Sequence, residues 1–241
     1  MPDKTIWKKL TVLITFFCLG LVSFTQQTDY IKIFGSDWLK AEAFVSLNEV
    51  WMKRLCDKYD VSYPMAMAVV FPEIVRYSAI RDKIEITLLK ALYINLGEDY
   101  ADFSIGQFQM KPSFAEALHK KAPMLKGRLR KLFQEKSKSD NIKKYREAIV
   151  RDLENPESQF LFLIAFLKIC ENVYPLEDID EDERLRFLAT AYNYSFQKSF
   201  DEVNKMTGKK FFYTKLVKGD SYSYADISAY WYENYQNNKQ R

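Results

Sequence analysis

Apolar side chains recur at three- and four-residue steps along much of this 241-residue chain, and this spacing predicts amphipathic helices. Residues 37–59 show the pattern most clearly. Residues 65–71 are almost wholly apolar, which is typical of a buried helix, and Pro72 is expected to interrupt that helix because proline has no N–H to donate within it. Helical patterns are also found at 82–96, 113–120, 126–153 (two charged helices), 157–174, 181–193 and from Ser223 onward.

Residues 98–112 break the helical pattern and predict a loop with a little extended structure. The segment follows Gly97, a favourable residue just past the end of a helix. Ser113 and Glu116 have the spacing of a capping box, which would begin the next helix at Ser113. With only seven glycines and seven prolines, the chain offers few of the turns that many-stranded folds need. The predicted fold class is therefore mainly α.

The N-terminus has the pattern of an export signal. Lys4, Lys8 and Lys9 precede an apolar stretch, residues 10–24, which is short for a membrane span. We expect residues 1–25 to be a signal peptide that directs the protein to the periplasm or cell envelope; the alternative is a retained anchor that associates with the membrane. The remaining predicted segments are an N-terminal helical segment (26–62), a central domain (63–205) and a Tyr/Trp-rich C-terminal helical extension (206–241).

Composition narrows the possible chemistry. The formal net charge is +4 without a block of basic residues, which argues against nucleic acid as a partner. His119 is the sole histidine, so neither a three-His zinc site nor a Ser-His-Asp triad is supported, and no metal or organic cofactor is predicted. Cys56 and Cys170 lie far apart in apolar helical patterns; we interpret them as buried free thiols, with a disulfide as the alternative.

Glu73 is the candidate acid/base group. It follows the apolar run 66–72 and precedes Ile74 and Val75. Apolar surroundings disfavour the charged carboxylate and raise its pKa, which is the property that a general acid needs near neutral pH. Taken alone, however, the position is explained more simply by a glutamate at a helix end that reaches solvent.

The segment 104–112 supports a binding site. Polar residues around a glycine, between two helices, suit a loop that lines a sugar cleft. Gly106 allows close approach of the backbone, and Phe108 can pack nearby. Gln107 and Gln109 add amide groups that hydrogen-bond to sugar hydroxyl and acetamido groups.

In combination, these motifs resemble the soluble lytic transglycosylases, a branch of the lysozyme-like superfamily. That family has a helix-end Glu, then a Ser-x-Gly-Leu-Met-Gln-type segment leading to a Pro, and later an Ala-Tyr-Asn. This chain matches the pattern in that order over roughly residues 60–200, with Glu73, with Ser104, Gly106, Gln109 and Pro112, and with Ala191, Tyr192 and Asn193. The resemblance implies that residues 63–205 form a lysozyme-like helical domain with a short loop or extended segment lining the cleft.

The chain departs from the family at several positions. Ile74 stands where the family usually has a serine, which removes one hydrogen bond expected near the acid, and Pro72 before the glutamate is unusual. Gln107 and Phe108 replace the common Leu and Met, and the extra helical segment 82–96 lengthens the stretch before the loop. The glutamate itself is present, so the catalytic interpretation is retained.

The resemblance implies a mechanism with one carboxylate. Protonated Glu73 would cleave the β-1,4 bond between N-acetylmuramic acid and N-acetylglucosamine in peptidoglycan, then accept the proton of the C6 hydroxyl as a 1,6-anhydro ring closes. Tyr192 and Asn193 would lie beside the carboxyl and acetamido groups, and Ser104 and Gln109 would hold the sugars.

Three alternatives remain open. A lysozyme-type hydrolase would need a second carboxylate, for which Glu98, Asp99 and Asp102 are the candidates. A non-catalytic glycan-binding or scaffold protein of an envelope machine would keep the fold without the chemistry, and an unrelated helical envelope protein would match the motifs by coincidence. The aromatic residues of the tail are interpreted as core packing, with a cover over the cleft as the alternative. Convergence of Glu73, Gln109 and Tyr192 on one groove separates the glycan-related hypotheses from coincidence.

Overall fold

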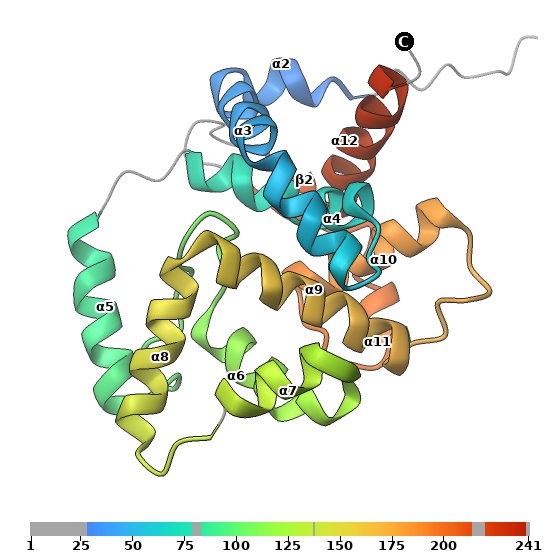
Figure 1. The fold of residues 1–241 in the computed structure, drawn as a ribbon. Helices are drawn as coiled ribbons and strands as arrows, with labels where there is room; N and C mark the ends of the chain where they lie inside the picture. The colour runs from blue at the N-terminus through green and yellow to red at the C-terminus, as the bar shows by residue number, and fades with distance from the viewer. Residues whose placement is uncertain (1–27, 79–82, 137, 214–219, 240–241) are drawn as a thin grey trace, which may run out of the picture.

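The computed structural model describes residues 28–78, 83–136, 138–213 and 220–239, and this part of the chain is mainly α-helical, as predicted (Figure 1). Residues 1–25, the predicted signal peptide, lie outside the described residues. The elements are α2 (Tyr30–Phe34), α3 (Ser36–Lys58), α4 (Tyr63–Ser78), α5 (Lys83–Leu96), α6 (Pro112–Lys121), a 3-10 helix η1 (Ala122–Met124), α7 (Gly127–Lys136), α8 (Ile142–Glu154), α9 (Pro156–Val173), α10 (Glu181–Asn193), α11 (Phe200–Asn204), β1 (Lys210–Phe212), β2 (Tyr222–Ser223) and α12 (Tyr224–Lys239).

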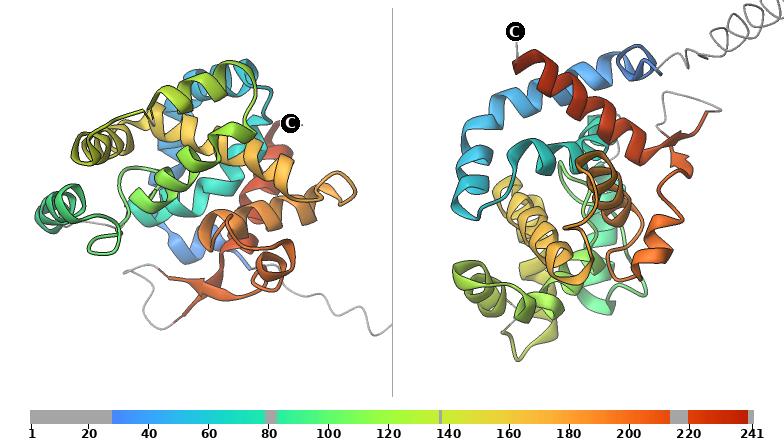
Figure 2. Two further views of the ribbon diagram at one scale, coloured as in Figure 1. Left: turned by 90° about the horizontal axis from the view of Figure 1, so that it is seen from below. Right: turned by 90° about the vertical axis from the view of Figure 1, so that its right-hand side faces the viewer.

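Most of the predicted helices are confirmed, with their ends close to the expected residues. Gly97 follows α5 with a φ of +103°, and its N–H donates to the carbonyl of Tyr93, so it ends the helix as expected. The Asn155 side chain caps α9 by accepting from the N–H of Ser158 at 2.9 Å. Helices α2 and α11 and the antiparallel β1–β2 hairpin were not predicted, because such short elements carry too few residues to show a period. The hairpin lies at the periphery of the molecule (Figure 2).

Helix α4 runs through Pro72, so the predicted interruption is wrong. Pro72 deprives the carbonyl of Ala68 of its usual intrahelical donor. Residues 65–75 are nevertheless all buried, because α4 packs against α3, α9, α10 and α12. Burial of this apolar surface on several sides outweighs one lost backbone hydrogen bond. Glu73 therefore lies inside a buried helix and not at its end.

The C-terminal helix is part of the same hydrophobic core as the helices before it. Trp231 of α12 stacks on Phe71 of α4 with ring centroids 5.2 Å apart, and Trp38 of α3 contacts the same Phe71 ring at 4.7 Å. The hydroxyl of Tyr224, fully enclosed at the start of α12, donates to the carbonyl of Val69 at 3.1 Å. Side chains from all three predicted segments after residue 25 thus share one core, and most aromatic side chains of the tail pack against it, while Tyr213 is exposed.

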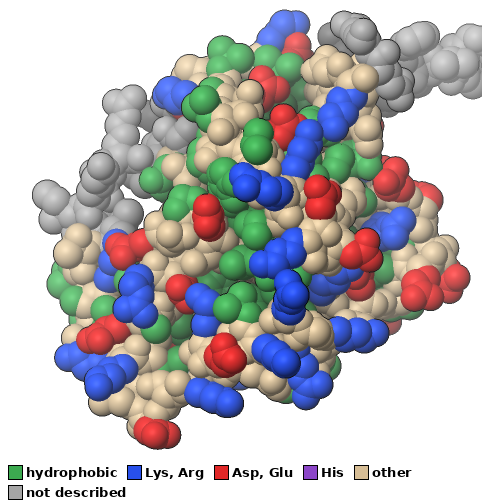
Figure 3. Space-filling model, in the orientation of Figure 1, with side chains coloured by type: hydrophobic (Ala, Val, Ile, Leu, Met, Phe, Trp, Pro, Cys, Tyr) green, Lys and Arg blue, Asp and Glu red, His purple; other side chains and the backbone are tan. Residues whose placement is uncertain are grey.

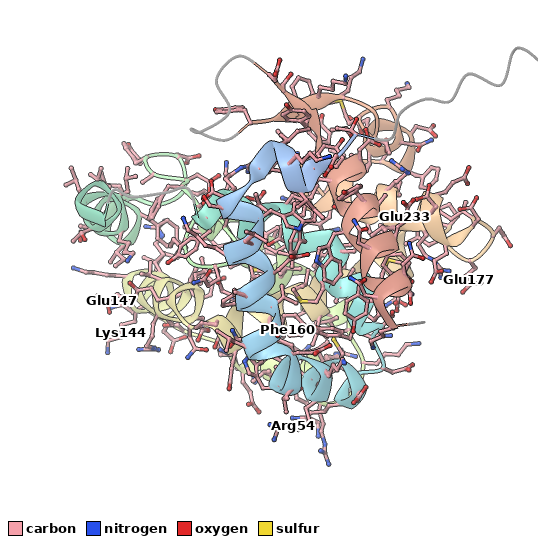
Figure 4. The ribbon with its side chains drawn as sticks, turned by 90° about the horizontal axis from the view of Figure 1, so that it is seen from above. Arg54, Lys144, Glu147, Phe160, Glu177 and Glu233 are labelled. Atoms are coloured by element: carbon pink, nitrogen blue, oxygen red, sulfur yellow. The ribbon has the colours of Figure 1, made fainter. Side chains whose placement is uncertain are left out.

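The remaining helices complete the outer shell. Helices α5 and α8 contact each other at one side of the molecule, and α6 and α7 lie to their right, below α9, in Figure 1. Seen from above, Phe160 of α9 lies near the middle of the molecule beneath α3 (Figure 4). Four of the labelled charged side chains lie at the edge of this view instead: Arg54, Lys144, Glu147 and Glu177. On the face drawn in Figure 3, positive and negative side chains are interspersed.

Both cysteines of the described chain are buried free thiols, which confirms that interpretation over a disulfide. Burial raises the pKa of the Cys56 thiol to about 12 and raises that of Cys170 well above its usual range. Neither thiol is therefore a nucleophile in the folded protein. Among the helices of the described ranges, none combines the length and the apolar character that crossing a membrane requires.

Candidate functional site

A pocket of about 240 Å³ lies where α4, the 98–111 loop, the start of α6 and the end of α10 meet. We call it the Glu73 pocket. Five of the predicted site residues line it: Glu73, Ser104, Gln109, Tyr192 and Asn193. Glu73, Gln109 and Tyr192 come from three segments that are far apart in the sequence, so the fold brings together the three residues whose convergence was the deciding criterion.

Glu73 is a buried carboxylate with one charged partner on its own helix. Its side chain is only 5% exposed, and Nη1 of Arg76, one turn later, lies 2.9 Å from both carboxylate oxygens. Burial raises the pKa of Glu73, whereas the positive charges of Arg76 and Lys111 oppose that rise. Desolvation is the largest of these effects, so the carboxyl holds its proton more strongly than a solvated glutamate does.

Arg76 is itself held from a second side. Its guanidinium lies over the Phe212 ring of β1, 4.5 Å from the ring centroid, and its side chain remains 29% exposed at the pocket. The hairpin thus supports Arg76, and Arg76 supports Glu73. Arg76 was not among the predicted site residues, although its three-residue spacing from Glu73 on a helix indicates that the two side chains are neighbours.

The loop before α6 is shaped by a buried glutamine of α9. Ile105 and Met110 exchange two backbone hydrogen bonds, of 2.9 and 3.1 Å, which closes the loop into a tight turn. Gln159 is fully buried; its Nε2 donates to the carbonyl of Ile105 at 2.6 Å, and its Oε1 accepts from the N–H of Phe108 at 3.3 Å. Gln159 was also missed, and the available signal was a polar residue inside an otherwise apolar helix.

Three predicted site residues do not line the Glu73 pocket. At Gly106 a φ of +70° and the close approach of Gln159 explain why the residue is a glycine. Phe108 is buried between Phe44 and Phe160, with centroids 6.0 and 5.8 Å away. Gln107, between these two residues, is half-buried outside the lining.

Tyr192 joins the end of α10 to the loop. Its hydroxyl donates to the carbonyl of Phe108 at 2.7 Å, and its ring contacts Phe114 and Phe166. Burial, aided by the nearby Glu73, raises the pKa of Tyr192 well above its usual range, so it stays neutral. Tyr192 thus lies near the Glu73 carboxyl, as predicted. Its hydroxyl proton is donated to the loop carbonyl of Phe108.

A second pocket adjoins the first. It has a volume of about 280 Å³ and shares Asn193 and Tyr194 with the Glu73 pocket. Tyr194 is 44% exposed, and Phe211 of the hairpin, which lines the second pocket, is 59% exposed. The two pockets therefore adjoin through shared lining residues, and exposed aromatic side chains lie along them.

A second carboxylate lies in the Glu73 pocket. Of the three candidates, Asp102 lines it, whereas Glu98 and Asp99 do not. Asp102 accepts a hydrogen bond from the backbone N–H of Ser113 at 3.2 Å and lies 3.3 Å from Nζ of Lys111. Helix α6 begins at Pro112, whose fixed φ suits the first helical position, so Ser113 lies inside the first turn. The predicted capping box, with Ser113 as the cap, is therefore wrong.

Comparison with known proteins returns no match. No protein-family model fits the chain, and neither a curated protein nor a solved structure matches it. The resemblance to the soluble lytic transglycosylases therefore stays a prediction from the motifs, and the function has to be argued from the site itself.

The described residues contain no group of three or more His, Cys, Asp or Glu side chains placed to hold a metal ion. His119 lies outside the Glu73 pocket, where its Nδ1 is 2.9 Å from the Tyr145 hydroxyl. The groups that this pocket offers for chemistry are thus two carboxylates, two cationic side chains, two tyrosines and several neutral hydrogen-bonding side chains.

Proposed function

We propose that this protein cleaves peptidoglycan glycan strands as a lytic transglycosylase of the periplasm or cell envelope, with Glu73 as its acid/base. One observation supports the proposal above the others: Glu73, Gln109 and Tyr192 line a single pocket. The order of the three motifs in the sequence predicted this convergence, and the shared pocket supports the proposal over a coincidental match of unrelated segments.

The properties of Glu73 suit the acid step. In this step the carboxyl gives its proton to the glycosidic oxygen, and the C1–O4 bond between N-acetylmuramic acid and N-acetylglucosamine breaks. The O6 hydroxyl of the same muramic acid then attacks C1, and its proton passes to the Glu73 carboxylate. The 1,6-anhydro ring closes, and the protonated glutamic acid is restored. The burial that raises the pKa of Glu73 favours the form that starts this cycle.

The neighbouring side chains suit a sugar polymer. Ser104, Gln109 and Asn193 offer hydroxyl and amide groups for sugar hydroxyls and acetamides. The adjoining pocket, with Tyr194 and Phe211, would bind the next sugars of a strand, since aromatic side chains with a few polar groups are typical of small-molecule sites.

The ion pair between Glu73 and Arg76 favours a second candidate function. A carboxylate paired with arginine holds no proton to donate, so a protein that kept this pair with a glycan bound would be a non-catalytic binding or scaffold protein. Asp102 in the same pocket is the residue on which a hydrolytic mechanism would depend.

Analysis of the products formed from purified peptidoglycan tests these functions. We would incubate the full chain, Glu73→Gln and Asp102→Asn with the polymer and identify soluble products by mass spectrometry, with circular dichroism as the control for folding. Glutamine at position 73 still accepts from Arg76, so loss of products reports on the proton and not on the fold.

The outcomes separate the candidates. Anhydro-muropeptides from the wild type and from Asp102→Asn, but not from Glu73→Gln, support the transglycosylase. Products with reducing ends that require Asp102 establish a hydrolase instead. Binding of peptidoglycan by all three proteins without soluble products identifies a non-catalytic glycan-binding protein.

A further inference from the structure

Arg76 has no counterpart in the motifs that led to the proposed function, yet it contacts the central carboxylate directly. We propose that Arg76 is a positioning residue that changes partners: it holds the Glu73 carboxylate before the glycan binds, and it pairs with a carboxylate of the bound glycan afterwards. Glu73 then takes up a proton as its partner leaves. The identity of the ligand as a glycan rests on the proposed function.

The hydrogen bonds of Arg76 leave donors for a ligand. Nη1 alone serves both oxygens of Glu73, at 2.9 Å each. Among the described residues, the other guanidinium nitrogens of Arg76 have no hydrogen-bond partner, while the side chain lines the pocket and is 29% exposed. A guanidinium carries five N–H groups and binds a carboxylate through two of them, so a ligand carboxylate has a fitting partner here.

The Phe212 ring restricts how Arg76 can move. The guanidinium lies 4.5 Å from the centroid of this ring, which is fully buried and packs edge-on against Phe34 and Tyr224. A cation over an aromatic face can slide or turn with little loss of that attraction. Arg76 can therefore exchange one carboxylate for another without leaving the ring.

The charges around Glu73 make the exchange and the proton uptake dependent on each other. The groups that face it are Arg76 from α4, Lys111 from the segment before α6, Tyr192 from α10 and Tyr224 from α12. Both tyrosines are buried and neutral, and Lys111 already pairs with Asp102 at 3.3 Å. Among the described residues, Lys111 is the only other cation whose charge acts on Glu73. In the proposed exchange, the carboxyl of Glu73, which is only 5% exposed, therefore takes up a proton once Arg76 turns to a ligand.

This coupling resolves the conflict between the ion pair and the acid role. Before binding, Arg76 lies against the Glu73 carboxylate and stabilises its charged form. With a carboxylate-bearing sugar bound, the same glutamate carries the proton that the glycosidic oxygen needs. The carboxylate has two possible sources in peptidoglycan, the lactyl group of muramic acid or the stem peptide, and the chemistry at Arg76 is the same for both.

Calorimetric titration with three small ligands tests the proposal. The ligands are the N-acetylglucosaminyl–N-acetylmuramic acid disaccharide with its free lactyl carboxylate, the same disaccharide carrying a stem peptide, and neutral chitobiose. None contains the bond that the proposed reaction cleaves. Titrations of the full chain in two buffers of different ionisation enthalpy give both the dissociation constant and the number of protons taken up.

We expect the wild type to bind a carboxylate-bearing ligand at least about tenfold more tightly than chitobiose, since a hydrogen bond to a charged group contributes about 1.5–3 kcal/mol. It should take up protons only with the charged ligand. Arg76→Gln should lose both effects, and Arg76→Lys should recover part of the preference. Glu73→Gln should keep the preference without proton uptake, and Arg151→Gln, an exposed arginine of α8 outside the pocket, should match the wild type.

Comparison of the two charged ligands identifies the source of the carboxylate. Equal affinity for charged and neutral sugars in the wild type, proton uptake that persists in Arg76→Gln, or binding of none of the three ligands would each overturn the exchange of partners. Cleavage of peptidoglycan together with equal affinities would overturn this inference alone. Proton uptake without any cleavage product would overturn the enzymatic proposal alone.

Discussion

Replacement of Gly106 by alanine tests how the loop beside the Glu73 pocket is held. The residue has a φ of +70°, and an added Cβ would lie 2.5 Å from Oε1 of Gln159 and 2.6 Å from the carbonyl oxygen of Leu153. The first neighbour is a buried side chain that holds the loop, and the second is backbone of α8, so neither can move aside cheaply. The left-handed backbone costs about 1–2 kcal/mol for a residue with a Cβ. Overpacking adds about 1–3 kcal/mol, so the expected loss of unfolding free energy is about 2–5 kcal/mol.

Two other glycines separate these contributions. Gly127 has a φ of +55° with nothing within 4 Å of the added Cβ, so Gly127→Ala measures the backbone strain alone. Gly208 has neither positive φ nor a close neighbour, so Gly208→Ala should leave stability nearly unchanged. Urea unfolding followed by circular dichroism gives the three free energies. If Gly106→Ala costs no more than Gly127→Ala, the contact with Gln159 and Leu153 is not what requires the glycine, and our account of the loop is refuted.

The same substitution should affect the pocket. The Gln109 amide donates to the Gly106 carbonyl at 2.8 Å, and Gln109 has a φ of +48°, so a displaced Gly106 moves Gln109 with it. Binding of a glycan fragment should therefore weaken in Gly106→Ala and remain at the wild-type level in Gly127→Ala, as measured by calorimetry.

Two further predictions concern the core. Trp231→Ala should lower the free energy of unfolding by about 3–5 kcal/mol because the ring is buried against Phe71. Tyr213→Ala, at an exposed position, should change that free energy little. Similar losses in both variants would contradict the place of α12 in the core. Burial lowers the pKa of His119 to about 4, so between pH 6.5 and 4 the unfolded chain binds a proton that the folded protein does not. The free energy of unfolding should fall by up to about 3 kcal/mol as the pH decreases through this window, and in His119→Gln this decrease should be absent. Equal dependence of the unfolding free energy on pH in the two proteins would contradict the burial of a neutral His119.

Local patterns determined the helical part of this protein. Helices α3, α9 and α10 were predicted nearly residue by residue, because their apolar period is intrinsic to each segment and Asn155 caps α9 through neighbours three residues away. The order of three motifs likewise predicted that Glu73, Gln109 and Tyr192 would meet. Burial of the two thiols followed from the apolar segments that contain them.

Contacts between distant segments decided the rest. The local sequence around Pro72 predicts a break in the helix. Only the packing of four helices around α4 makes the continuous helix favourable. The roles of Gly106 and Gln159 were hidden because each depends on the other across more than fifty residues of chain. Phe212 supports Arg76 through a hairpin too short to show a period. Periodicity and capping act over a few residues, whereas the charge and burial of Glu73 depend on neighbours that only the folded chain brings together.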